Sequence, residues 1–264
     1  MSGHGNDFIV IDNHSGDITA NWSERASVWC KRRTSIGADG LLILEPSKAG
    51  DFRLKIFQAD GSEAEMCGNG ARCAAGFAGE KGFAKSRMVM ETEAGMVGAF
   101  VEDDMVAIQL TNPSSPEDER FLEIDDMHIP FYSINSGVPH AIIFRDRVVE
   151  ISADELAKTG SAVRFHPAFE PAGTNVDFVE IIESGHIRVR TYERGVEGET
   201  LACGTGAVAS SIISSRFKGA GDPPIQVEMP GGMLIVDFKN RDGSFEDAWL
   251  KGKIDFVYEG RIAL

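Results

Sequence analysis

The sequence predicts a two-lobed fold of the α+β or α/β class, and three observations lead to it. The pentapeptide at 67–71 (CGNGA) returns at 203–207 as CGTGA, and a glutamate, Glu63 or Glu199, stands four residues before each cysteine. The 264 residues are enough for two domains of about 130 residues each. The 29 glycines favour a loop-rich and strand-rich protein over a helix bundle. We therefore expect two pseudo-equivalent halves with one thiol each.

The net charge of −15 argues against a nucleic-acid partner, because phosphate contacts need a basic face. It does not exclude an anionic small molecule, since helix N-termini and one arginine can hold a carboxylate. No run of about 18 apolar residues exists, and the first residues lack the basic and apolar regions of a signal peptide. We expect a cytoplasmic protein with no membrane partner.

The cysteines are few and unevenly spaced, at Cys30, Cys67, Cys73 and Cys203. This pattern fits neither a disulfide scaffold nor a zinc site, which would need paired Cys or His ligands at short spacing. For Cys30 and Cys73, which lie outside the repeat, we expect simple packing in the core, as is usual for free cysteine. No metal site is predicted.

Three segments of the first half predict β-strands, and one predicts a helix. Residues 8–12 and 41–44 are short apolar runs, and residues 51–58 alternate apolar with polar side chains. Residues 23–33 predict a helix with Ser23 as its N-cap.

Each copy of the repeat predicts a helix that begins directly after its cysteine. Residues 68–77 and 204–215 are rich in small side chains. Each thiol is then expected at a helix N-terminus, where backbone N–H groups and the macrodipole favour thiolate over thiol.

The next segments predict an antiparallel meander followed by a change of lobe. The expected strands are 88–92, 96–101 and 106–110. Residues 111–118 are rich in turn formers and chain breakers and have the composition of a linker. We place one lobe at 1–112 and the other at 113–264, with a terminal segment that packs back onto the first lobe.

The second half repeats the plan of the first. The expected strands are 131–134, 141–144, 175–179 and 186–192, with a helix near 154–157. A late hairpin is expected from residues 225–229 and 233–238 around a Pro-Gly-Gly turn. In each lobe a strand-rich sheet accompanies a central helix of small residues.

Two matched thiols suggest acid–base chemistry at carbon. One thiolate removes a proton and the opposite thiol returns one to the other face, which inverts the carbon. A cysteine hydrolase needs one nucleophile and one histidine base, so it leaves the second copy of the repeat unexplained. The developing negative charge at an amino acid's α-carbon needs nearby donors, which two helix N-termini supply.

Other candidate groups are Glu193 and Arg194, which lie close to Cys203 in the sequence, and His140. Glu193 and Arg194 can hold the ammonium and carboxylate of an amino acid, although a surface ion pair is the alternative. His140 is either a hydrogen-bonded loop histidine or an auxiliary group near the thiols. Residues 204–209 also fit the GxGxxA dinucleotide fingerprint, but a loop from 193 to 203 stands where the fingerprint needs a strand.

Six motifs appear in the order typical of one known family. They are GHGNDF at 3–8, IGADGL at 36–41, ADGSEAEMCGNGARC at 59–73, GVPH at 137–140, NVDFVE at 175–180 and ERGVEGETLACGTGA at 193–207. On these motifs the chain resembles diaminopimelate epimerase along almost its whole length. The resemblance implies an α+β fold of two pseudo-symmetric lobes, each a mainly antiparallel sheet wrapped around a central helix.

The resemblance also implies a cofactor-independent homodimer that interconverts LL- and meso-diaminopimelate in lysine and peptidoglycan precursor synthesis. Cys67 and Cys203 would be the acid–base pair, with His140 and Glu193 beside them. The residues that would bind the substrate are Asn6, Gln58, Gly68, Asn69, Asn175, Glu193, Arg194, Gly204 and Thr205. Of these, Gly68, Asn69, Gly204 and Thr205 would bind it through their backbone N–H groups. Tyr258 would lie at the dimer contact.

The chain departs from the family pattern at three positions. Gln58 stands where the family usually has asparagine, Val138 where it often has asparagine, and Gly40 where it sometimes has glutamine. Members of the family also usually have a few strand residues before the GHGNDF motif, whereas this sequence begins almost at it. The alternatives are a related racemase of another amino acid and a nucleotide-binding or structural two-lobed protein.

Overall fold

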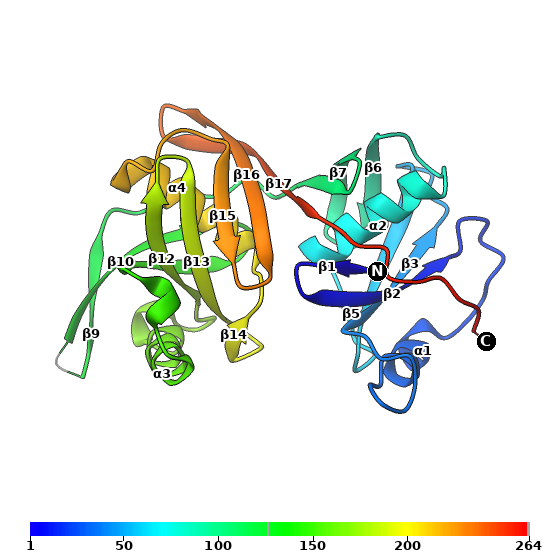
Figure 1. The fold of residues 1–264 in the computed structure, drawn as a ribbon, viewed down its shortest axis with the longest axis horizontal. Helices are drawn as coiled ribbons and strands as arrows, with labels where there is room; N and C mark the ends of the chain where they lie inside the picture. The colour runs from blue at the N-terminus through cyan, green and yellow to red at the C-terminus, as the bar shows by residue number, and fades with distance from the viewer. Residues whose placement is uncertain (126, 263–264) are drawn as a thin grey trace. The chain divides into compact units, whose positions relative to one another are not determined.

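A computed structural model of the chain describes residues 1–125 and 127–262, which fall into two compact units (Figure 1). Unit 1 consists of Met1–Gln109 together with the end of the chain from Lys251. Unit 2 is Leu110–Leu250. Strand β17, Ser244–Lys253, runs from unit 2 into unit 1.

The described residues of unit 1 form two helices and eight strands that lie wholly within it. Its elements are β1 (Ser2–Gly3), β2 (Asn6–Asp12), α1 (Trp22–Trp29), β3 (Gly40–Glu45), β4 (Phe52–Gln58), β5 (Glu63–Ala64), α2 (Gly68–Glu80), β6 (Arg87–Thr92), β7 (Gly95–Glu102) and β8 (Met105–Gln109). Strands β2 and β3 are parallel, as are β4 and β6, and the other pairs formed by β1 to β8 are antiparallel. Helix α2 packs against β1 to β4, β7 and β8.

Unit 2 repeats this order of elements. They are β9 (Arg120–Ile124), β10 (Met127–Asn135), β11 (Pro139–Phe144), η1 (Val148–Glu150), α3 (Ala153–Arg164), η2 (Pro167–Phe169), β12 (Asn175–Glu183), β13 (His186–Glu193), β14 (Gly198–Thr200), α4 (Gly204–Lys218), β15 (Ile225–Met229), β16 (Gly232–Arg241) and β17. Here β11 and β12 are parallel, as are β13 and β15. The order β2-α1-β3-β4-β5-α2-β6-β7 of unit 1 thus matches β11-α3-β12-β13-β14-α4-β15-β16. The predicted α+β fold, with a mainly antiparallel sheet and a central helix in each half, is confirmed.

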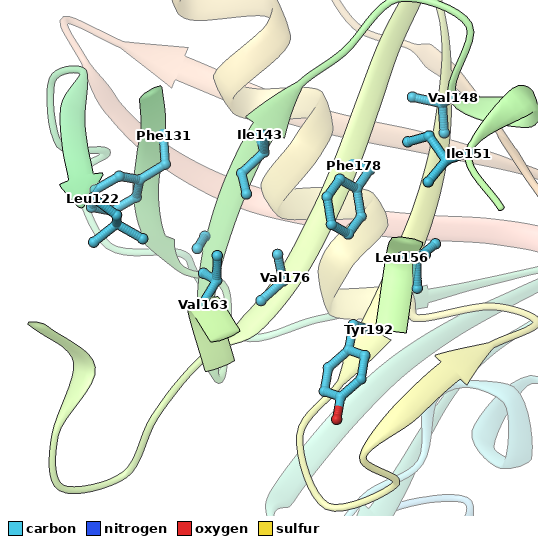
Figure 2. Close-up of a cluster of buried hydrophobic side chains, with 11 residues drawn as sticks. Leu122, Phe131, Ile143, Val148, Ile151, Leu156, Val163, Val176, Phe178 and Tyr192 are labelled. Carbon is cyan, nitrogen blue, oxygen red and sulfur yellow. The ribbon is translucent and has the colours of Figure 1, made fainter. Parts of the chain in front are cut away.

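Alternating side chains of unit 2 divide its sheet into two faces. Val176 and Phe178 of β12 point toward α3 and join a buried cluster with Tyr192 of β13 and with Leu156 and Val163 of the helix (Figure 2). Because successive residues of a strand face opposite sides, the residues between them point to the face that α4 covers. In unit 1 a second buried cluster joins the indoles of α1 to Leu41, Ile43 and Phe57.

Most predicted elements are present, with differences at their ends. The helix predicted over 23–33 spans Trp22–Trp29, and its N-cap is Asn21, whose side chain accepts the Glu24 N–H at 3.3 Å. Ser23 is not the cap, because its hydroxyl donates to the Gly61 carbonyl at 2.7 Å. Strands β1, β5, β9, β14 and β17 were not predicted, and β14 lies inside the stretch expected to be a loop.

Candidate active site

Cys67 is the N-cap of α2. Its backbone is extended, with φ −145° and ψ 115°, and its Sγ accepts the Gly70 N–H at 3.5 Å. Side-chain sulfur in this position takes the place of the oxygen that usually caps a helix. Gly70 also lets the first turn approach the sheet, since a Cβ there would lie 3.1 Å from Leu42 Cδ2. The predicted start of the helix directly after Cys67 is confirmed.

A chain of side-chain hydrogen bonds surrounds the first turn of α2. Arg72 Nη2 donates to Asn69 Oδ1 at 2.5 Å, and Asn69 Nδ2 donates to Asn6 Oδ1 at 2.6 Å. Asn6 Nδ2 in turn donates to Asp39 Oδ2 at 3.1 Å. Since guanidinium only donates and carboxylate only accepts, the two ends of the chain fix the orientation of both amides. Asn6 and Asn69, both predicted site residues, are therefore held in defined orientations.

Arg72 is a buried cation in this network. Its side chain is fully buried, and burial lowers its pKa to about 10. Besides Asn69, its Nη2 contacts His4 Nδ1 at 3.2 Å, while its Nε and Nη1 have no hydrogen-bond partner among the described residues. At the other end of the network, Arg32 bridges Asp7 and Asp39 on the surface. Gln58, also predicted for the site, is exposed at the end of β4.

Cys203 is the N-cap of α4 and is almost fully buried. Its Sγ lies 3.5 Å from Thr205 Oγ1. Burial raises the pKa of this thiol far above its ordinary value, and the carboxylates of Glu193 and Asp177 raise it further. The nearby Thr205 hydroxyl and Gly206 N–H offset only part of this rise. The expectation that a helix N-terminus makes this cysteine a thiolate is wrong, because desolvation outweighs the donors of the helix.

His140 lies at the centre of a buried polar network on the α4-facing side of the sheet. It is in β11 rather than in a loop, and its Nδ1 lies 2.6 Å from Asp177 Oδ2. Its Nε2 lies 3.0 Å from Thr205 Oγ1 and 3.4 Å from Asn175 Nδ2. Asp177 Oδ1 also accepts the Thr191 hydroxyl at 2.6 Å. The network thus connects His140 to Thr205, whose hydroxyl lies next to the Cys203 sulfur.

Glu193 and Arg194 follow at the end of β13. Glu193 is half-buried, and burial raises its pKa. The Arg194 backbone N–H donates to Asn175 Oδ1 at 2.8 Å, and its guanidinium donates to the Ala172 carbonyl at 3.3 Å. Unit 2 therefore gathers its predicted site residues around one helix start.

Several residues of these networks were not predicted. Among them are Asp39, Arg72, Asp177 and Thr191. Asp177 had a signal in the sequence, since it stands two residues after Asn175 in a strand and so shares its face. By contrast, Cys30 and Cys73 are buried, and burial raises their pKa to about 11 and about 12, respectively. This burial agrees with the packing role predicted for both cysteines.

Within residues 1–125 and 127–262, no three His, Cys, Asp or Glu side chains are grouped so that they could hold a metal ion.

Comparisons with known proteins identify the family. The family model for diaminopimelate epimerase matches residues 1–115 and 132–257. The diaminopimelate epimerase of Aquifex aeolicus is 40% identical over 275 residues, which cover 100% of this chain and 96% of the relative. The chain belongs to the diaminopimelate epimerase family. The enzyme of that name from Chlorobaculum tepidum is 37% identical, with 100% of both chains covered.

Solved structures share the fold of this family member at low sequence identity. A Bacillus anthracis protein of the phenazine biosynthesis PhzF family has a TM-score of 0.70 at 15% identity, covering 96% of this chain and 92% of that one. A hydroxyproline epimerase from Agrobacterium vitis has a TM-score of 0.65 at 18% identity, covering 96% and 87%. No described helix is long and apolar enough to span a membrane.

Proposed function

We propose that this chain interconverts LL- and meso-diaminopimelate by proton transfer at the α-carbon, with Cys67 and Cys203 as base and acid. The observation that carries the proposal is that each cysteine is the N-cap of the central helix in one of two equivalent units. A reaction that inverts a carbon needs one group on each face, and the repeat supplies two of the same kind. The family membership supports diaminopimelate as the substrate.

The environments of the thiols support different roles at the start of a turnover. Cys203 is buried beside carboxylates that raise its pKa, so it is suited to hold the proton that is delivered. Cys67 is more exposed and accepts a backbone N–H, so it is suited to remove the first proton in one reaction direction. The roles exchange in the reverse direction. The proposed reaction needs one base and one acid, so we expect activity without a cofactor.

The remaining predicted residues are assigned to substrate binding in this proposal. The first-turn N–H groups of α2 and α4, at Gly68–Asn69 and Gly204–Thr205, would bind the reacting carboxylate, as helix N-termini do for anions. The side chains that would bind the polar groups of the substrate are Asn6, Gln58, Asn175, Glu193 and Arg194. His140 would act beside the thiols.

The experiment that tests the reaction compares the wild type with Cys67→Ala and Cys203→Ala. LL-diaminopimelate is followed by its optical change and by exchange of its α-hydrogen with solvent deuterium. We expect epimerisation by the wild type and a loss of at least 10²-fold in either variant, the lower range for a general acid or base. Near-normal epimerisation by either variant would exclude the two-thiol mechanism. Turnover of proline, histidine or glutamate instead of diaminopimelate would exclude the substrate.

We also propose a cytoplasmic homodimer that contributes to lysine and peptidoglycan precursor synthesis. Support comes from the C-terminal segment of unit 1, where Phe256, Val257 and Tyr258 are 51%, 61% and 71% exposed. Such an apolar surface is typical of a protein contact. Light scattering after size exclusion should give twice the chain mass for the wild type and a smaller mass for Tyr258→Asp. A monomeric wild type would contradict the proposal.

A further inference from the structure

The repeat places three buried polar side chains of unit 2 where unit 1 has apolar ones. The glycine three residues after each cysteine marks the equivalence, since a Cβ at Gly70 would lie 3.1 Å from Leu42, and one at Gly206 would lie 2.5 Å from Asp177 Oδ1. The strand registers extend it to neighbouring strands. The equivalent pairs are Phe8 and His140, Leu42 and Asp177, and Ile56 and Thr191. All six are buried, so the fold can fill these positions with apolar groups.

A buried carboxylate at a position that accepts leucine needs another reason, because burial of an ionised group is costly unless it is paired and hydrogen-bonded. Asp177 is 0% exposed, and both of its oxygens are engaged, one by Thr191 and the other by His140. Because a carboxylate accepts hydrogen bonds, His140 Nδ1 carries the proton in this contact.

The opposite side of the His140 ring leads to the same tautomer independently. The Arg194 backbone N–H can only donate, so the Asn175 oxygen faces it and the Asn175 amide nitrogen faces His140 Nε2. Nε2 therefore meets a donor and must accept. The Thr205 hydroxyl, 3.0 Å from Nε2, then donates its hydrogen to His140. Its lone pairs remain available to the Cys203 thiol at 3.5 Å.

We propose that Asp177 is a positioning residue for the thiol of Cys203. It holds His140 in the Nδ1–H tautomer, His140 orients the Thr205 hydroxyl, and this hydroxyl accepts the S–H of Cys203. Ser136 supports the arrangement, because its hydroxyl donates to the Thr205 carbonyl at 2.8 Å. The inference rests on the proposed role of Cys203 as the proton donor.

The charged groups around Cys203 act in the same direction. Glu193 from β13 and Asp177 from β12 both disfavour a second negative charge on the sulfur. His140 from β11 is their hydrogen-bonding neighbour and bears no net charge in the tautomer described above. The resting state of Cys203 is thus a thiol with a fixed acceptor.

The substitution Asp177→Asn tests this arrangement. Where the Thr191 hydroxyl still donates to the oxygen of the new amide, as it does to Asp177 Oδ1, the amide nitrogen donates to His140 Nδ1 and moves the ring proton to Nε2. ¹⁵N spectra of histidine in the variant show whether the amide has this orientation. His140 then donates to Thr205, whose hydroxyl turns toward the sulfur and stabilises thiolate. We expect Cys203 to be alkylated by iodoacetamide about tenfold faster at neutral pH, equivalent to a decrease of about one unit in its pKa. We expect kcat for diaminopimelate to fall about 10²-fold, with KM changed less than threefold.

Two controls separate positioning from stability. Thr191→Val keeps the Asp177 charge and the His140 contact, so alkylation of Cys203 should change less than threefold. If Asp177→Asn does not fold, ¹⁵N spectra of histidine in the wild type still decide the tautomer. Cys67, measured by mass spectrometry in the same samples, should keep its wild-type alkylation rate.

The outcomes distinguish this inference from the proposed function. Wild-type His140 protonated at Nε2, or unchanged or slower alkylation of Cys203 in a folded Asp177→Asn variant whose His140 is protonated at Nε2, would overturn the positioning role. A wild type that does not turn over diaminopimelate would overturn the function, while the tautomer and alkylation rates would still test the hydrogen-bond chain.

Discussion

The two glycines Gly70 and Gly206 offer a test of how tightly each helix start is packed. In Gly206→Ala the new Cβ would lie 2.5 Å from Asp177 Oδ1 and 3.3 Å from Cys203 Cβ. The carboxylate cannot move aside freely, because hydrogen bonds of 2.6 Å hold both of its oxygens. Loss of one bond to a charged group costs about 1.5–3 kcal/mol. The higher helix propensity of alanine than of glycine offsets up to about 1 kcal/mol of this cost. We therefore expect a net destabilisation of about 1–2 kcal/mol.

Gly70→Ala is the matched control at the equivalent position of unit 1. Its Cβ would lie 3.1 Å from Leu42 Cδ2, the end of a flexible side chain, and 3.6 Å from its next neighbours. The contact can relax by a small rotation, so the change should be close to neutral, within about 1 kcal/mol.

Calorimetry of both variants measures the difference. For a unit of this size, about 1–2 kcal/mol corresponds to a Tm lowered by roughly 2–8 °C in Gly206→Ala. Because the units can unfold separately, the transition of unit 2 is the one compared. Equal melting of unit 2 in wild type and Gly206→Ala would show that Asp177 is not held in place, and the packing argument would fail.

Three further predictions concern the core, the buried thiols and the network of unit 1. Phe178→Ala removes a ring that is 1% exposed from the cluster in Figure 2. Chemical unfolding should show unit 2 destabilised by about 3–5 kcal/mol. A loss below about 1 kcal/mol would contradict the described packing. Burial raises the pKa of Cys73 to about 12, so the folded state keeps its proton while the unfolded thiol ionises; the free energy of unfolding should fall as pH rises from about 9 toward 12. Cys73→Ala should reduce that slope, and an identical slope would refute the assignment. Arg72→Met removes the donor that orients Asn69 and should raise KM at least about tenfold. Unit 1 should stay folded, because apolar replacement of a poorly paired buried cation is often tolerated. An unchanged KM in steady-state assays would show that this hydrogen-bond network does not contribute to substrate binding.

The parts of the site that depend on local sequence could be predicted, and those that depend on distant contacts could not. The helix starts at Cys67 and Cys203 follow from the small residues after each cysteine, and both are confirmed. The protonation of Cys203 depends on its burial and on carboxylates elsewhere in the chain, so the dipole argument alone gave the wrong sign. Asp177 was missed because its partner His140 is 37 positions away, on another strand.

The secondary structure shows the same dependence on local sequence. The buried strand β3 was predicted from its apolar run, and the alternation in β4 predicted its half-buried character. β14 is only three residues long and pairs with β13, so its sequence has no periodicity to recognise. The cap of α1 was displaced from Ser23 because a tertiary contact with Gly61 occupies that hydroxyl.

The repeat also separates what the helix N-termini contribute from what the surrounding side chains contribute. Both cysteines are N-caps with extended backbone, so the macrodipole acts similarly on the two sulfurs. They differ in that the Gly70 N–H caps the Cys67 side chain, whereas the Cys203 side chain makes no capping hydrogen bond. The buried charges differ in sign: unit 1 has the cation Arg72 beside Asn69, whereas unit 2 has the carboxylate Asp177 beside His140. A difference in resting protonation between the thiols would therefore come from these side chains, from burial and from the capping hydrogen bond of Cys67. A symmetric backbone is compatible with opposite starting roles because the side chains around the two helix starts have diverged.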